Sequence, residues 1–417
     1  MKKLVALLLV TVLFASVACI AGAETKEIVI WRPQNTVQIE EWVAGQIDAF
    51  NAQYAGQYHV TQQTFPKSGA DSYTEKVSTA VLTNRLPDLL FVDGPNVAGY
   101  AENGIIVPLD EFVTAEDKAD MIDSCLKQGT YNDKLYAVAL WESSVGIFYN
   151  KDILAEAGIE VPAKIEDAWT WSQLYDVAKS LTTKDHFGIT LNTNASQITY
   201  YYSPLYVQLG SDMVSADGTV ANGYVNSEAG VKVANYLKSF YTDGIANIEP
   251  VSTEFADGKS ALWLATSYQV TTLSNYPDLN WGITYYPVSD EGVGGTPTGS
   301  WTVAVTSNAS DPQGAYLFLD YLTNTAANIT GCPAAGYLPP RYSSSEALPE
   351  FNDEPYAKFA EQLIKNGAPR PRTPVFTALN ASFNAGISDI VLGSDAQAKL
   401  DEVAQKVDDE YRMNFGF

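Results

Sequence analysis

Hydrophobic and polar residues recur along this chain with two spacings, one typical of strands and one typical of helices. Short runs rich in apolar and β-branched residues at 28–31, 58–61 and 89–92 predict strands. Between them, residues 38–53 and 73–82 carry apolar side chains close to helical spacing, which predicts helices. This alternation favours an α/β fold whose strands pair in parallel.

The same pattern continues through the rest of the 417 residues. It predicts further strands at residues 135–139 and 145–152, and helices near residues 114–127, 171–181, 227–243, 311–324 and 395–412. Two of these helices are preceded by the cap signals Asn226-Ser227 and Ser310-Asp311-Pro312, which predict N-terminal caps. A chain of this length suggests two domains or one large one. Because no Gly/Ser linker divides it, we expect several short crossings between them.

The first 23 residues have the three-part pattern of a bacterial secretory signal peptide. A cationic start at residues 1–3 precedes an apolar stretch, and the small residues 21–23 follow it. The apolar stretch is shorter than the ~20 residues that cross a bilayer. Two processing routes stay open: cleavage after Ala23, or a lipobox that would leave Cys19 acylated. Either route predicts an exported protein, in the periplasm or on the outer face of the cytoplasmic membrane.

Composition argues against several classes of partner. The 49 acidic residues against 25 basic ones give a formal charge of −24, which opposes binding to nucleic acid or to anionic lipid. Three cysteines and two histidines are too few for the usual zinc cages, so we expect no metal and no other cofactor. Cys125 and Cys332 would remain after export, either as a disulfide or as two buried thiols.

Motifs for catalysis are incomplete in this sequence. Residues 257–260 resemble the end of a phosphate-binding loop, but Thr253 replaces its leading Gly. The two histidines, His59 and His186, lie far apart and have no Cys close by. Neither a G-x-S-x-G elbow nor an H-E-x-x-H motif occurs. We therefore expect no catalytic residues.

Aromatic residues occur beside polar ones at the ends of predicted elements. Such groups lie at residues 31–35, 141–143, 200–203, 267–269 and 299–301. Sugars need both kinds of partner, because their C–H faces stack on flat rings while their hydroxyls need hydrogen bonds that replace lost water. Any single aromatic residue is more often a core residue, so the grouping is what predicts a carbohydrate site.

Several short segments resemble one protein family, in the order in which the family has them. They are PDLLFVD at 87–93, YAENGIIVPL at 100–109, YNKD at 149–152, WSQL at 171–174 with AKSLT at 178–182, FADGKSAL at 255–262 and GYLPPR at 336–341. Together they resemble family 1 of the extracellular solute-binding proteins, the sugar receptors of bacterial ABC importers typified by maltodextrin-binding protein. The resemblance covers nearly the whole chain after the predicted signal peptide.

That resemblance implies a periplasmic-binding-protein-like fold of two α/β lobes. A hinge of several crossings would join the lobes, and the ligand would bind in the cleft between them. The implied lobe 1 consists of residues 24–139 plus about 302–335, and lobe 2 of residues 142–299 plus about 336–417.

The resemblance and the aromatic groups also imply which side chains face the ligand. Stacking is expected of Trp141, Tyr200, Tyr268 and Trp301. Hydrogen bonding to hydroxyl groups is expected of Arg32, Gln34, Asn35, Asp93, Glu142 and Ser143, and the predicted site is completed by Ser300, Phe376 and Asn380. The family often has a Trp near the position of Asn380, so this sequence departs from the family pattern there.

The predicted function is that of a non-enzymatic, monomeric receptor that captures a mono- or oligosaccharide and delivers it to a membrane permease. Membrane contact is expected only through a lipid anchor or the permease. Two alternatives stay open. The same fold could bind an organophosphate, a polyamine or a peptide, with Arg32, Arg341, Arg370 or Arg372 serving an anion. An exported glycan hydrolase would need a pair of carboxylates across the cleft.

Overall fold

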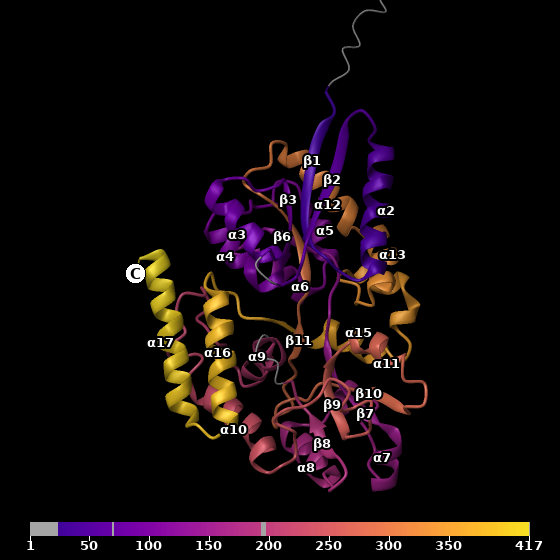
Figure 1. The fold of residues 1–417 in the computed structure, drawn as a ribbon, viewed down its shortest axis with the longest axis vertical. Helices are drawn as coiled ribbons and strands as arrows, with labels where there is room; N and C mark the ends of the chain where they lie inside the picture. Colours follow the sequence, from indigo (N-terminus) through magenta and orange to yellow (C-terminus); the bar gives the residue numbers. More distant parts are fainter. Residues whose placement is uncertain (1–23, 69–70, 193–196, 417) are drawn as a thin grey trace, which may run out of the picture.

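The computed structural model describes residues 24–68, 71–192 and 197–416, so the predicted signal peptide and Cys19 lie outside the described residues. Its strands form two main sheets, which appear one above the other in Figure 1. The upper sheet has the strand order β2 (Tyr58–Phe65), β1 (Lys26–Pro33), β3 (Leu89–Asp93), β12 (Trp301–Val305) and β6 (Ala137–Ala139). The lower sheet has the order β10 (Trp281–Thr284), β7 (Val145–Asn150), β9 (Ser260–Thr266) and β8 (Phe187–Thr190). Each sheet is the centre of one α/β lobe, which confirms the predicted fold class.

Strand pairing in the two sheets is mixed. β1 is parallel to β2 and to β3, as predicted. However, β12 is antiparallel to β3 and β6, and β7 is antiparallel to β9 and β10. The expectation of parallel pairing is wrong for these strands, because a parallel pair needs a long crossover on the same sheet. β7 and β12 instead enter their sheets directly from the other lobe or the hinge.

Helices cover both faces of the upper sheet in lobe 1. α2 (Val37–Gln53) buries Ile39, Val43, Ile47 and Phe50, which share one helical face. The other helices of this lobe are α3 (Tyr73–Thr83), η1 (Gly94–Asn96), α4 (Val97–Glu102), α5 (Ala115–Asp120), α6 (Asp123–Gly129), α12 (Pro312–Thr323) and α13 (Thr325–Ala335). A short hairpin of β4 (Thr130–Tyr131) and β5 (Lys134–Leu135) follows α6.

Lobe 2 is built around the lower sheet. Alternate residues of β7 serve two cores: Ile147 packs with the helices on one face, and Phe148 packs on the other. Its helices are α7 (Lys151–Ala157), η2 (Ile165–Asp167), α8 (Trp171–Leu181), α9 (Ile198–Gln208), α10 (Glu228–Thr242), α11 (Gln269–Leu273), α16 (Phe376–Val391) and α17 (Ala396–Phe415). The last two form a long hairpin that runs along the side of this lobe in Figure 1.

Three chain segments cross between the lobes. Residues 140–144 join β6 to β7, and residues 299–300 join β11 (Thr296–Thr298) to β12. After α13, residues 336–341 lead to α14 (Tyr342–Ala347), η3 (Pro349–Phe351), α15 (Ala357–Asn366) and β13 (Gly367–Pro369). β13 pairs in parallel with β11 beside the crossings. The absence of a flexible linker is thus explained by three short, adjacent crossings, while the numbered lobe boundaries stay a prediction.

Predictions of helix ends were accurate where a single side chain caps the helix. The Ser227 hydroxyl accepts the N–H of Gly230, and the Asp311 carboxylate accepts that of Gly314, so both predicted caps are confirmed. The single helix predicted at residues 114–127 is two helices, because Met121 is extended and pairs with Arg341 of the third crossing. Cys125 and Cys332 are free, buried thiols.

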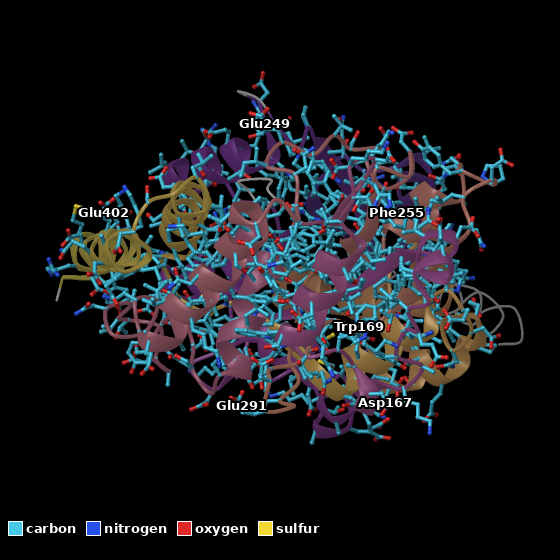
Figure 2. All side chains as sticks on the ribbon, turned by 90° about the horizontal axis from the view of Figure 1, so that it is seen from below. Asp167, Trp169, Glu249, Phe255, Glu291 and Glu402 are labelled. Atoms are coloured by element: carbon cyan, nitrogen blue, oxygen red, sulfur yellow. The ribbon has the colours of Figure 1, made fainter. Side chains whose placement is uncertain are left out.

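The acidic surplus lies at the surface. Figure 2 shows Glu249, Glu291 and Glu402 at the outline of the molecule, while Phe255 and Trp169 lie inside it. Among the helices of the described residues, none combines the length and the apolar character needed to cross a bilayer.

Candidate ligand-binding site

A cavity of about 390 Å³ lies between the two lobes. Lobe 1 contributes Asp93 at the end of β3 and Trp301 at the start of β12, which face each other in the sheet register. Lobe 2 contributes Tyr200 and Tyr201 of α9 and Tyr268 beside α11. The remaining lining residues are Ser143, Gln197, Thr266, Gln269, Gly299, Ser300, Tyr337 and Arg370. A hinge motion would therefore open or close this cavity.

Two other hollows of the described residues belong to lobe 2 alone. One of about 630 Å³ is bounded by α7, the end of α8 and residues 183–186. Another of about 350 Å³ lies between α9, α10 and α16. Neither receives a side chain from lobe 1, so closure of the lobes cannot enclose a ligand there. The inter-lobe cavity is the better candidate.

An ion pair forms one wall of the cavity. Nη2 and Nη1 of Arg370 donate to Oδ1 and Oδ2 of Asp93, at 2.6 and 3.1 Å. The guanidinium also lies over the rings of Tyr200 and Phe376, 5.4 and 5.9 Å from their centroids. Of the described residues that line the cavity, these two are the charged ones, and each neutralises the other.

Three aromatic rings form a stack that ends at the cavity. The ring of Trp141 lies 5.6 Å from that of Tyr337 at an interplanar angle of 9°, and Tyr337 lies 6.0 Å from Tyr268 at 27°. Burial raises the pKa of Tyr337 to about 12, so its hydroxyl keeps its proton at neutral pH. The stack holds the Tyr268 ring in place beside the cavity.

A hydrogen-bond chain orients Tyr200. Ser143 Oγ donates to the carbonyl of Gly299 at 2.7 Å and lies 2.8 Å from the Tyr200 hydroxyl. Because the single hydroxyl proton of Ser143 is used on Gly299, the Tyr200 hydroxyl must donate to Ser143. Burial raises the pKa of Tyr200, which keeps that proton in place.

The structure brings part of the predicted site together. Around the cavity lie Asp93, Ser143, Tyr200, Tyr268, Ser300 and Trp301. The predicted group at the end of β1 lies elsewhere. Arg32 is buried and donates to both carboxylate oxygens of Glu40 and to Gln62. Gln34 is exposed outside the cavity, and Asn35 Oδ1 accepts from Lys67.

Four further predicted residues do not line the cavity. Trp141 and Glu142 are fully buried, Trp141 behind Tyr337 and Glu142 among backbone N–H groups. Phe376 lies behind Arg370, and Asn380 accepts from Asn384 within α16. In this conformation these four side chains can support the site but cannot contact a ligand in the cavity.

Seven lining residues were not among the side chains predicted to contact a sugar. Tyr201 and Gln269 lie inside the aromatic and polar groups at residues 200–203 and 267–269, but they were not singled out as ligand contacts. Gln197 and Thr266 lie just outside these groups. Gly299 precedes the predicted Ser300. Tyr337 and Arg370 come from the third crossing and its continuation, where no periodic pattern marks which side chains face inward.

Comparison with known proteins agrees with the two-lobe fold. A family model described as bacterial extracellular solute-binding protein matches residues 45–358. The chain belongs to this family. The resemblance found in the sequence segments is thereby confirmed. This solute-binding protein is 22% identical over 354 residues to a binding protein of Brucella abortus, covering 81% of this chain and 84% of the relative.

Solved structures show the same fold as this solute-binding protein. The sugar-binding protein MalE of Xanthomonas citri has a TM-score of 0.81 and 20% identity, over 93% of this chain and 98% of its own. The cyclic alpha-maltosyl-1,6-maltose binding protein of Arthrobacter globiformis has a TM-score of 0.79 and 21% identity, over 93% and 100%. The family and both structures are binding proteins rather than enzymes, and the family is extracellular.

Proposed function

We propose that this solute-binding protein captures an uncharged carbohydrate in the inter-lobe cavity and delivers it to the permease of an ABC importer. One observation carries the proposal: the cavity combines flat rings with neutral hydroxyl and amide groups, while Asp93 and Arg370 cancel each other's charge. A sugar offers matching C–H faces and hydroxyls. The similar structures from Xanthomonas citri and Arthrobacter globiformis, both described as binding sugars, support this ligand class.

The two lobes contribute complementary parts of the proposed site. Trp301 belongs to lobe 1 and Tyr268 to lobe 2, so a sugar ring between them would meet an aromatic side chain from each lobe. Gln197, Gln269 and Thr266 would supply neutral donors and acceptors for hydroxyl groups. Closure of the lobes would complete these contacts and shield them from water.

The anion-binding alternative is weakened by the partners of the four arginines. Arg32 pairs with Glu40, and Arg370 pairs with Asp93. Arg341 is buried, donates to the Thr323 carbonyl and lies 3.5 Å from Asp120, and Arg372 donates to the Thr130 carbonyl. A phosphate group in the cavity would have to displace Asp93 from Arg370.

The hydrolase alternative lacks its carboxylate pair. Among the described residues that line the cavity, Asp93 is the one carboxylate, and it is bound to Arg370. Glu142 is buried beneath the lining and holds backbone N–H groups. Glycoside hydrolysis usually needs two carboxyl groups that face the bond to be cut.

The role of the family and the hinge between the lobes both support delivery of the bound sugar to a permease. We propose that the protein acts as a monomer, with lobes divided at the predicted boundaries. It would be either free after cleavage behind Ala23 or tethered through an acylated Cys19. The permease would receive the sugar when the lobes open.

Intrinsic fluorescence titration tests the ligand class. The panel contains maltose, cellobiose, chitobiose, lactose and galactose, with glucose 6-phosphate, spermidine and a tripeptide as charged alternatives. We expect a saturable change with at least one neutral saccharide. The Trp301→Phe variant should lose most of that change, whereas Trp281→Phe, at the outer edge of the lower sheet, should keep it. Saturation with a charged ligand only, or with none, contradicts the proposal.

A further inference from the structure

Glu142 lies beneath the cavity and connects all three crossings. Its Oε1 accepts the backbone N–H groups of Ser143, at 2.8 Å, and of Gly299, at 2.6 Å. Its own backbone forms a two-way bridge with Leu338, with N–O distances of 2.8 and 2.7 Å. The first crossing is therefore bound to the second through the carboxylate and to the third through the main chain.

Gln128 of α6 extends this network in lobe 1. Its Nε2 donates to Oε2 of Glu142 at 3.4 Å, and its Oε1 accepts the N–H of Ser300 at 3.3 Å. Ser143, Gly299 and Ser300, which all line the cavity, form what we call the cavity floor. Two buried side chains thus hold the backbone of the whole floor from below.

Gly299 is the residue of the cavity floor whose conformation depends most on these hydrogen bonds. Its φ of +143° lies in the region that favours glycine. A Cβ at this position would lie 3.0 Å from Nη2 of Arg370 and 3.1 Å from Oε1 of Gln128. The ion pair and Gln128 therefore leave little room around Gly299. The hydrogen bond from the Gly299 N–H to Glu142 fixes the orientation of its peptide group.

We propose that Glu142 is a positioning residue: without contacting the ligand, its carboxylate fixes the cavity floor and so sets the shape of the binding site. The inference rests on the proposed function, since it takes the inter-lobe cavity as the ligand site. It assigns to Glu142 an indirect role in place of the direct hydroxyl contact predicted from the sequence.

The surroundings of Glu142 predict a pH signature. Facing it are the Cys125 thiol of α6 at 3.5 Å, Arg370 with its partner Asp93, and Tyr200 of α9. Burial raises the pKa of Glu142 to about 7. The backbone N–H groups of Ser143 and Gly299 oppose that rise most, followed by the Cys125 thiol and the positive charge of Arg370. Burial and the neighbouring Glu142 raise the pKa of Cys125, so the thiol stays protonated across neutral pH. The carboxyl group should thus change its charge near neutrality and alter its bond to Gly299.

Nuclear magnetic resonance can observe that bond without any ligand. Thr precedes Gly at two places in the sequence, before Gly299 and before Gly331. Labelling with ¹³C-carbonyl threonine and ¹⁵N-glycine therefore selects two amides, and Gly331 of α13 is an internal control. We expect the Gly299 amide shift to titrate near pH 7 in the wild type and to stay flat in Glu142→Gln. An unchanged titration in Glu142→Gln overturns the inference.

Ligand affinity provides the second measurement, with maltose or the panel saccharide that gives the strongest saturable signal. We expect the dissociation constant to rise at least tenfold in Glu142→Ala and to be partly restored in Glu142→Gln, whose amide oxygen can still accept both N–H groups. The matched control is Glu254→Gln, because Glu254 is also buried and bonded, to Thr190 and Asn247, in lobe 2. A folded Glu142→Ala variant with wild-type affinity contradicts the inference. If no saccharide binds the wild type, the proposed function fails, and the amide titration still decides the role of Glu142.

Discussion

Arg370 and Asp93 form a two-pronged ion pair where the lobes meet, with N–O distances of 2.6 and 3.1 Å. Asp93 ends a strand of lobe 1, whereas Arg370 follows β13 and lies over the Tyr200 ring of lobe 2. The side chain of Arg370 is 13% exposed, so the guanidinium depends on Asp93 for its compensating charge. The pair joins the lobes and leaves the cavity without net charge.

Removal of the Asp93 charge should change which ligands bind. In Asp93→Asn the guanidinium would be left largely buried without a carboxylate partner. We expect the affinity for the panel saccharide to fall about tenfold, or ~1.4 kcal/mol. Affinity for glucose 6-phosphate should rise, because a phosphate can replace the lost carboxylate. Isothermal titration calorimetry measures both.

The control for this prediction is a pair on the outside of lobe 2. Asp389 lies 3.2 Å from Lys399 between α16 and α17, where both side chains are partly exposed. Asp389→Asn should leave both affinities unchanged. Wild-type saccharide affinity in Asp93→Asn would show that the ion pair does not shape the site.

Tyr268 should contribute through its ring. Tyr268→Ala removes the end of the Trp141–Tyr337–Tyr268 stack beside the cavity and should weaken saccharide binding about tenfold, since aromatic contacts contribute ~0.5–1.5 kcal/mol beyond buried area. Tyr268→Phe keeps the ring and should lose much less. Fluorescence titration compares the two with Tyr224→Ala, a partly exposed tyrosine outside the cavity. Equal losses in the Ala and Phe variants would point to the hydroxyl instead of the ring.

The sequence predicted those site residues best that lie next to a strand end or within an aromatic and polar group. Asp93 directly follows the strand predicted at residues 89–92, and Trp301 lies in the aromatic and polar group at residues 299–301; the structure places the two opposite each other at one edge of the sheet. Tyr200 and Tyr268 were found because each lies in an aromatic and polar group.

The missed and misplaced residues depend on tertiary contacts. Arg370 faces the cavity because β13 pairs with β11, a contact between distant segments that the sequence pattern does not encode. Arg32 was predicted to contact the ligand. Its guanidinium instead donates to the carboxylate of Glu40, which lies eight residues later on the next helix. Trp141 and Glu142 lie next to Ser143 in the sequence, yet only Ser143 lines the cavity.

Protein stability should depend on pH through Glu142. The pKa of about 7 in the folded protein lies above the ordinary value of 4.5, because burial disfavours the charged form. Between these values the folded state holds a proton that the unfolded chain releases. The contribution of Glu142 to the free energy of unfolding therefore falls as pH rises from 4.5 to about 7 and is constant above that, a total of about 3 kcal/mol.

Glu142→Gln cannot ionise and should lack this decline. Urea denaturation at pH 5 and pH 8 should show the variant gaining stability relative to the wild type at the higher pH. Glu254→Gln serves as the control for replacing a buried glutamate. If the free energy of unfolding changes with pH by the same amount in the wild type and in Glu142→Gln, the Glu142 carboxyl group has the same pKa in the folded and the unfolded protein, which contradicts the prediction.

Gly299 should tolerate no side chain. Gly299→Ala places a Cβ against Arg370 and Gln128 in a backbone conformation that costs ~1–3 kcal/mol for other residues. We expect lower stability and weaker saccharide binding. Gly393→Ala is the matched control, because Gly393 has a φ of +119° but no neighbour within 4 Å of a Cβ. It should lower stability in urea denaturation and leave binding intact, so equal effects of both variants on binding would exclude a special role for position 299.

The central claim, an uncharged saccharide held between the lobes, is tested most directly by native mass spectrometry of the protein purified from its own host. We predict a bound species whose mass, after release and fragmentation, corresponds to one or more sugar units. Its occupancy should fall sharply in Trp301→Ala and stay unchanged in Trp281→Phe. Release of a phosphate ester, polyamine or peptide instead, or a saccharide whose occupancy does not depend on Trp301, would contradict the account.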